Sequence, residues 1–172
     1  MGHSPVDEGL YKLRVNGVVE ESIVDGPGLR YVVFTQGCPH KCKGCHNPGT
    51  HRSGAGHVLD IRDILRGFIE NPLLSGITFS GGEPFLQPGP LSVLAAQVNG
   101  LGKNVAVYTG YEYEQLRDLA RQDAYIGKLL DLTDILIDGP YVESLRNLEL
   151  QYRGSSNQRV LELKNGRISS SF

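Results

Sequence analysis

Three cysteines crowded into eight residues are the clearest candidates for chemistry in this sequence. Cys38, Cys42 and Cys45 have the spacing C-x3-C-x2-C, and the chain contains no other cysteine. An odd number of crowded thiols does not form a disulfide scaffold. We therefore expect a reducing, cytoplasmic compartment in which these thiols bind metal.

Three kinds of site compete for these thiols. Zinc takes four ligands, so it would also need His40, His46 or His51. Buried structural thiols are a second alternative. We favour an iron–sulfur cluster, because a tight loop of thiolates can hold its irons. Electron carriers use four cysteines, so three leave one iron open to substrate, which favours an enzyme over an electron-transfer module.

The elements around the cysteines would gather further polar groups at one edge of a sheet. Strands are expected at 29–36, 76–80, 104–109 and 134–138, and helices at 60–70, 91–98, 113–121 and 126–132. This alternation is typical of βα units with a parallel sheet. Each strand ends in a glycine-bearing loop, and ligands bind beyond the carboxyl ends of such strands. The candidate site therefore collects Cys38, the turn Gly81-Gly82-Glu83, Thr109 and Asp138.

The length of the chain limits the architecture. A closed eight-stranded barrel needs about 250 residues, and this chain has 172. We predict one α/β domain over 1–172 with an open sheet: a partial (β/α) barrel of about four to six mostly parallel strands, or a doubly wound sheet. Residues 1–9 are expected to be loose, and 11–21 to form a hairpin or edge strand. Residues 159–168 form a possible hairpin, because Asn165-Gly166 is a favourable two-residue turn.

Charge and hydropathy exclude two classes of partner. The chain has 17 basic and 19 acidic residues, which argues against a general nucleic-acid binder. No apolar run approaches the roughly 20 residues that span a bilayer, and the N-terminus lacks a secretion signal. We expect no nucleic-acid or membrane partner.

The cysteine segment resembles that of radical S-adenosylmethionine (SAM) enzymes, whose hallmark is C-x3-C-x2-C after the first strand. Those enzymes usually have an aromatic residue before the third cysteine, where this chain has Gly44. The form Gly-Cys-His-Asn at 44–47 resembles a narrower family, the anaerobic ribonucleoside-triphosphate reductase-activating proteins. Motifs similar to those of the family follow in order at 25–30 (DGPGLR), 34–48, 77–84 (ITFSGGEP), 108–111, 136–141 and 152–159 (YRGSSNQR).

The resemblance implies a radical SAM type of partial barrel and a set of cofactor contacts. The three cysteines would hold a 4Fe–4S cluster whose open iron binds SAM, and the radical would be borne by the cofactor, so no catalytic side chain is assigned. Expected cofactor-binding residues are Gly44, Cys45, His46, Gly81, Gly82, Glu83 and Asp138. Structural alternatives remain open: a tight turn at 80–83, a capping His46 and a turn-forming Asp138. The roles of 25–28, Thr109, Arg153 and Asn157 also stay open.

The resemblance also implies a reaction and its partners. Reductive cleavage of SAM would yield a radical that removes hydrogen from a glycine Cα of anaerobic ribonucleoside-triphosphate reductase. A reductant such as flavodoxin would supply the electron. The alternatives are activation of another glycyl-radical enzyme such as pyruvate formate-lyase, a small-molecule radical SAM reaction, and a non-enzymatic iron–sulfur electron-transfer module.

Overall fold

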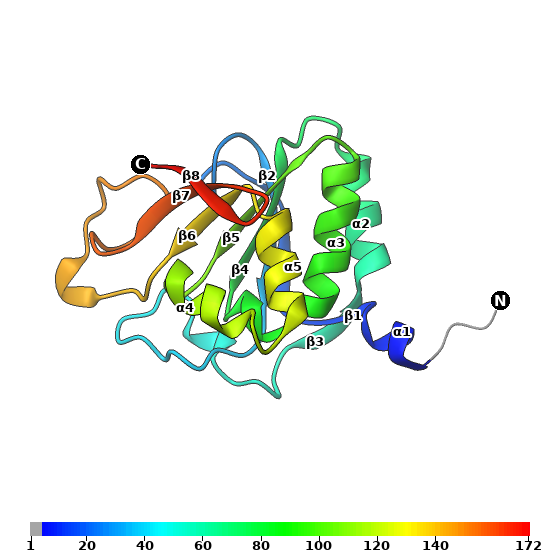
Figure 1. Cartoon of the computed structure of the whole chain (residues 1–172), viewed down its shortest axis with the longest axis horizontal. Helices are drawn as coiled ribbons and strands as arrows, with labels where there is room; N and C mark the ends of the chain where they lie inside the picture. The colour runs from blue at the N-terminus through cyan, green and yellow to red at the C-terminus, as the bar shows by residue number, and fades with distance from the viewer. Residues whose placement is uncertain (1–4) are drawn as a thin grey trace.

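One mixed β-sheet forms the centre of the computed structural model, which describes residues 5–172 (Figure 1). Its eight strands lie in the order β3-β1-β2-β4-β5-β6-β7-β8, and the edge strands β3 and β8 do not pair, so the sheet is open. The strands are β1 (Lys12–Ser22), β2 (Arg30–Thr35), β3 (His57–Asp60), β4 (Gly76–Gly81), β5 (Asn104–Tyr108), β6 (Ile135–Asp138), β7 (Arg159–Lys164) and β8 (Arg167–Ser171).

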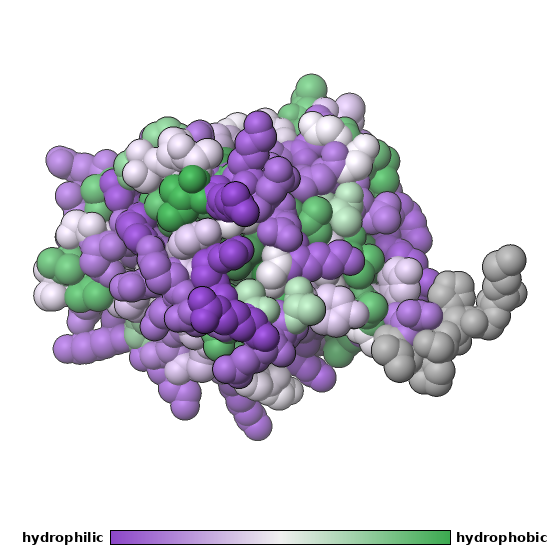
Figure 2. All heavy atoms as spheres, in the orientation of Figure 1, coloured by the Kyte–Doolittle hydropathy of each residue, from purple (hydrophilic) through white to green (hydrophobic). Residues whose placement is uncertain are grey.

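The larger helices cover one face of this sheet. Figure 1 shows α2, α3 and α5 side by side in front of the strands. The helices are α1 (Pro5–Gly9), α2 (Ile61–Glu70), α3 (Pro88–Gly100), α4 (Tyr113–Leu119) and α5 (Ala124–Leu132), with 3-10 turns η1 (Pro48–Thr50), η2 (Pro84–Leu86) and η3 (Glu143–Leu145). Figure 2 shows the same side with mostly hydrophilic residues at its surface and scattered hydrophobic ones. The apolar faces of these helices therefore turn inward.

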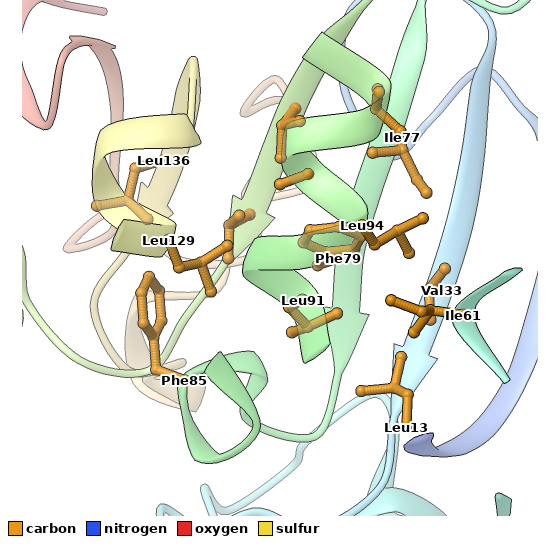
Figure 3. Packing of buried hydrophobic residues seen from close by; sticks show 14 of the residues in the cluster. Leu13, Val33, Ile61, Ile77, Phe79, Phe85, Leu91, Leu94, Leu129 and Leu136 are labelled. Carbon is orange, nitrogen blue, oxygen red and sulfur yellow. The ribbon is translucent and has the colours of Figure 1, made fainter. Parts of the chain in front are cut away.

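The hydrophobic core lies between this helix layer and the sheet. Phe79 of β4 lies against Leu94 of α3, and both are fully buried (Figure 3). Burying one such side chain contributes about 1.5–3 kcal/mol. Strand side chains alternate between faces, so Val33 of β2 joins this core while the neighbouring Arg30 and Val32 are buried outside it. The sheet thus has a second buried face that the helices do not cover.

Local signals explain where these elements begin and end. Asp60 caps α2 by accepting a hydrogen bond from the backbone N of Arg62 at 2.9 Å, and Asn71 ends the helix before Pro72. Positive φ angles of 100°, 91° and 97° are adopted by Gly37, two residues after β2, by Gly81, the last residue of β4, and by Gly139, directly after β6. Glycine reaches this region without steric cost. The chain can therefore turn sharply at the carboxyl end of each of these strands.

The four strands expected from the sequence are present as β2, β4, β5 and β6, and they pair in parallel. The expectation of four to six mostly parallel strands is wrong, because the sheet has eight strands and four antiparallel pairings. Segments outside the βα units add the extra strands. β1 is one continuous strand rather than a hairpin, and it is not at the edge, because β3 pairs with its outer side.

The C-terminal hairpin is confirmed, and it extends beyond 168 to Ser171. Asn165 and Gly166 both have positive φ, 50° and 70°, as a type I′ turn requires. At the other end of the chain, 5–9 of the segment expected to be loose form the short helix α1, and 1–4 lie outside the described residues. Within 5–172, no helix is long and apolar enough to cross a membrane.

Candidate functional site

A cavity of about 380 Å³ opens at the carboxyl ends of the parallel strands. Its wall includes Gly81 at the end of β4, Gly82 after it, Thr109 after β5 and Gly139 after β6. All three cysteines line the same cavity. Sites for cofactors and small ligands typically enclose about 300–1,000 Å³. Of the groups that the sequence placed at strand ends, the topology therefore brings Cys38, Gly81, Gly82 and Thr109 together around this cavity.

The cysteines lie on the loop between β2 and η1. The loop is closed at its base, where the backbone N of Gly37 donates to the carbonyl of Thr50 at 2.6 Å and that of Cys38 to the carbonyl of His51 at 3.2 Å. Cys38, Cys42 and Cys45 are free and half-buried. Burial raises the pKa of the Cys38 thiol, and a metal bound to sulfur would keep that thiol deprotonated. The thiols are thus held on one wall and stay accessible from the cavity.

The three thiols match an iron–sulfur cluster in number and chemistry, because thiolates are the usual protein ligands of its irons. Their common exposure to the cavity also matches the cluster expected from the sequence.

Two buried side-chain nitrogens that lack a hydrogen-bond partner indicate that this cavity binds a polar ligand. His51 Nε2 and Arg153 Nε are the buried side-chain polar atoms in the described part of the chain that have no hydrogen-bond partner. Both residues line the cavity. Buried polar groups are normally hydrogen-bonded, so a polar ligand that accepts from Arg153 Nε and bonds His51 Nε2 would satisfy both atoms. From the sequence, His51 was considered only as a zinc ligand, and the role of Arg153 stayed open between a contact with the partner protein and one with SAM.

The expected cofactor-binding residues divide into two groups. Four line the cavity: Cys45, His46, Gly81 and Gly82. Three are not among its lining residues: Gly44, Glu83 and Asp138. Gly44 lies on the side of the cysteine loop that faces Glu143, where an added Cβ would come within 2.9 Å of its carboxylate. The two carboxylates have partners of their own inside the fold.

The glycine pair serves the packing of the backbone as well as the cavity. An added Cβ at Gly82 would lie 2.2 Å from the carbonyl oxygen of Gly37, at the base of the cysteine loop. The next residue, Glu83, donates its backbone N–H to that same carbonyl at 2.8 Å. A side chain at Gly82 would therefore displace the cysteine loop itself. The close approach of the Gly82 backbone to Gly37 therefore explains both the tight turn and the bare backbone that lines the cavity.

Asp138 is engaged by the elements beside it. Its Oδ1 accepts from Arg159 Nε at 2.9 Å, and its Oδ2 accepts from the backbone N of Tyr113 at 2.7 Å and from a second Arg159 nitrogen. Arg159 also bonds Glu114 at 2.8 Å. These two carboxylates raise the pKa of the Arg159 guanidinium by accepting its hydrogen bonds. Asp138 thus ties β6 to β7 and to the start of α4.

An aromatic pair that the sequence did not reveal stands beside the cysteines. The rings of His46 and Tyr141 lie 5.2 Å apart, and both residues line the cavity. Tyr141 follows the Gly139-Pro140 turn after β6. Its position in the 136–141 motif was the available signal, but only the fold shows which ring it meets.

The 25–30 motif is anchored by a buried guanidinium. Arg30 is fully buried and donates to the carbonyl of Ile77 at 2.6 Å and to the hydroxyl of Thr78 at 3.0 Å. That hydroxyl donates in turn to the carbonyl of Asp25 at 2.8 Å. Desolvation lowers the pKa of Arg30 to about 10. The arginine thereby holds Asp25, which lines the cavity, against the second face of the sheet.

Comparisons with known proteins show which family the chain belongs to. Residues 24–161 match the family described as a 4Fe-4S single cluster domain. The chain is 35% identical over 151 residues to the anaerobic ribonucleoside-triphosphate reductase-activating protein of Salmonella typhimurium, covering 83% of this chain and 94% of that protein. The protein of the same name from Escherichia coli K12 is 34% identical over the same extent. The pyruvate formate-lyase-activating enzyme of Clostridium pasteurianum is 34% identical over 132 residues, which cover 73% of this chain and 55% of that enzyme.

Proposed function

Because this chain belongs to the family of anaerobic ribonucleoside-triphosphate reductase-activating proteins, we propose that it generates a glycyl radical on such a reductase, with SAM and a 4Fe–4S cluster as cofactors. The observation that carries the proposal is the wall of three free thiols in a cavity at the carboxyl ends of parallel strands. When bound, the cluster supplies the electron that cleaves SAM, and so the radical that removes hydrogen from a glycine Cα.

The chain's own residues would hold the two cofactors. Cys38, Cys42 and Cys45 are the proposed ligands of three irons, and the absence of a fourth cysteine leaves one iron for SAM. Gly81 and Gly82 present bare backbone to the cavity, which supports close approach of SAM.

Other residues of the cavity wall offer aromatic rings and a hydrogen-bond donor to the rest of SAM. The His46–Tyr141 pair offers an aromatic surface for the adenine. The guanidinium of Arg153 suits a carboxylate, and its unpaired buried Nε supports that role.

We propose that the chain forms a single domain over 1–172 with a radical SAM type of partial barrel, which the fold of residues 5–172 supports. The open sheet and its four central parallel strands support the assignment. The antiparallel strands at both ends extend the sheet without closing it. Free thiols that bind a cluster support a reducing, cytoplasmic compartment.

Apolar side chains at the cavity mouth support a protein substrate. Val24 and Leu148 both line the cavity, and they are 71% and 80% exposed. Exposed apolar groups around a site are typical of protein-binding surfaces. A docked loop of the reductase would cover them and exclude water from the radical. Exposed Lys41 and Lys43 beside the cluster support an acidic electron donor such as flavodoxin.

The test is activation of a protein substrate under anaerobic conditions. The reconstituted chain, reductant, SAM and the reductase are expected to produce a glycyl-radical signal in electron paramagnetic resonance (EPR). Replacing the acceptor glycine of the reductase by alanine should abolish it. The second candidate is pyruvate formate-lyase, because an activating enzyme of that lyase is 34% identical to this chain. A radical on the lyase and none on the reductase would reject the reductase as substrate.

A further inference from the structure

The buried carboxylate of Glu83 has all of its partners inside the protein. The side chain is 0% exposed. Oε1 accepts from the backbone N of Phe85 at 3.0 Å and from the hydroxyl of Thr109 at 2.9 Å. Oε2 accepts from the backbone N of Gly110 at 2.9 Å and lies 2.7 Å from His40 Nε2. A carboxylate has about four acceptor positions, so these donors leave none for the ammonium group of a ligand.

His40 belongs to the cysteine loop and stands between the first two cysteines. Its ring meets the ring of Tyr111 edge-on, with centroids 4.5 Å apart. An added Cβ at Gly110 would lie 2.4 Å from His40 Cδ2. Since an ionised carboxylate only accepts hydrogen bonds, His40 Nε2 is the donor to Glu83. The His40 ring therefore packs between two turns: the turn after β4, which carries Glu83, and the turn after β5, which carries Gly110 and Tyr111.

We propose, building on the function proposed above, that Glu83 is a positioning residue for the cysteine loop. It acts through His40 and does not bind the amino group of SAM. This arrangement around His40 joins three motifs that are far apart in the sequence: the cysteine loop, the glycine turn after β4 and the Thr-Gly-Tyr turn after β5. It explains why a charged side chain follows the glycine pair and yet does not line the cavity.

The test compares Glu83→Gln, His40→Leu and the double variant in the reconstituted full-length chain. Glu143→Gln is the matched control, because Glu143 contacts the same loop through an exposed ion pair with Lys43 at 3.6 Å. Three quantities are measured: the rate of iron release to a chelator, the EPR spectrum of the reduced cluster and the Kd of SAM.

Both single variants are expected to speed iron release on the order of tenfold, because a charge-assisted buried bond is lost. Both should shift the cluster spectrum in the same way. The double variant should be no faster than the faster single one, since both side chains act through one contact. Glu143→Gln should match the unmodified chain.

Two results would overturn the proposal. One is a weaker SAM affinity in Glu83→Gln alone, with iron release and spectrum unchanged, which would indicate direct contact with SAM. The other is independent, multiplying effects in the double variant. If Glu83→Gln does not fold, Thr109→Val removes a donor to the same carboxylate and should also speed iron release. These readouts do not depend on which protein receives the radical, so they are separate from the test of the proposed function.

Discussion

Replacing Asp138 by asparagine tests whether this carboxylate holds the fold together or contacts SAM. Asp138 is 1% exposed and accepts from both Arg159 and the backbone N of Tyr113. The amide keeps one acceptor oxygen and turns an NH2 group toward one of these donors. The structure therefore predicts a loss of stability, with little direct effect on the cavity.

The size of the loss follows from the contacts. One hydrogen bond to a charged group contributes about 1.5–3 kcal/mol. Arg159 is partly exposed and keeps its bond to Glu114, so solvent and that carboxylate moderate the loss. We expect about 2–3 kcal/mol, a decrease in Tm of roughly 4–12 °C for a chain of this size.

The assay is urea unfolding of the full-length chain, followed by circular dichroism, together with SAM binding to the reconstituted protein. Glu114→Gln is the control, because it removes an exposed partner of the same arginine and should cost at most about 1 kcal/mol. Unchanged stability of Asp138→Asn, combined with a large loss of SAM affinity, would refute the reasoning and assign Asp138 to the ligand.

Four further predictions concern the cluster, the turn, the rim and pH. Alanine at any one of the three cysteines should abolish a stable cluster, measured as iron and sulfide per chain; full iron occupancy in the triple variant would contradict the ligand assignment. Gly82→Ala should reduce cluster retention as well as SAM binding, because its Cβ meets the Gly37 carbonyl; iron retention at the original level would count against this. Leu148→Asp should reduce radical transfer to the reductase several-fold while SAM affinity stays constant, and equal transfer would exclude Leu148 from the interface. Arg159 lowers the pKa of Glu114, so the stability that Glu114 contributes should be present above its unfolded pKa near 4.5 and be lost as pH falls through the lower folded value; a Glu114→Gln difference that persists at lower pH would contradict this.

Local signals in the sequence predicted most of the βα elements. The strands at 76–80 and 104–109 are short runs of residues that favour β-structure, and a glycine follows each of them. The helix after Asp60 is capped by Asp60 and ends at Asn71. The hairpin at Asn165-Gly166 is likewise encoded by the turn itself. Each of these features depends on neighbours within a few residues, so a sequence pattern is enough to find it.

The number of strands was not predictable in the same way. β3 has four residues in a polar, glycine-containing segment, and it is a strand because β1 pairs with it across more than forty positions (Lys12 opposite Asp60). β1 carries the signal of an edge strand and becomes an inner strand for the same reason. Pairing between distant segments decides such cases, and no local propensity records it.

Within the candidate site, the sequence alone determined which groups could bind cofactors: three thiols at a spacing typical of a cluster, and a glycine pair at a strand end. Only the tertiary structure decided which polar side chains face the cavity. Glu83 and Asp138 have the charge and position expected of SAM contacts, yet their donors come from residues 43 and 21 positions away, His40 and Arg159. A carboxylate binds the donors that the fold brings to it, and those donors are known only when distant segments have been placed together.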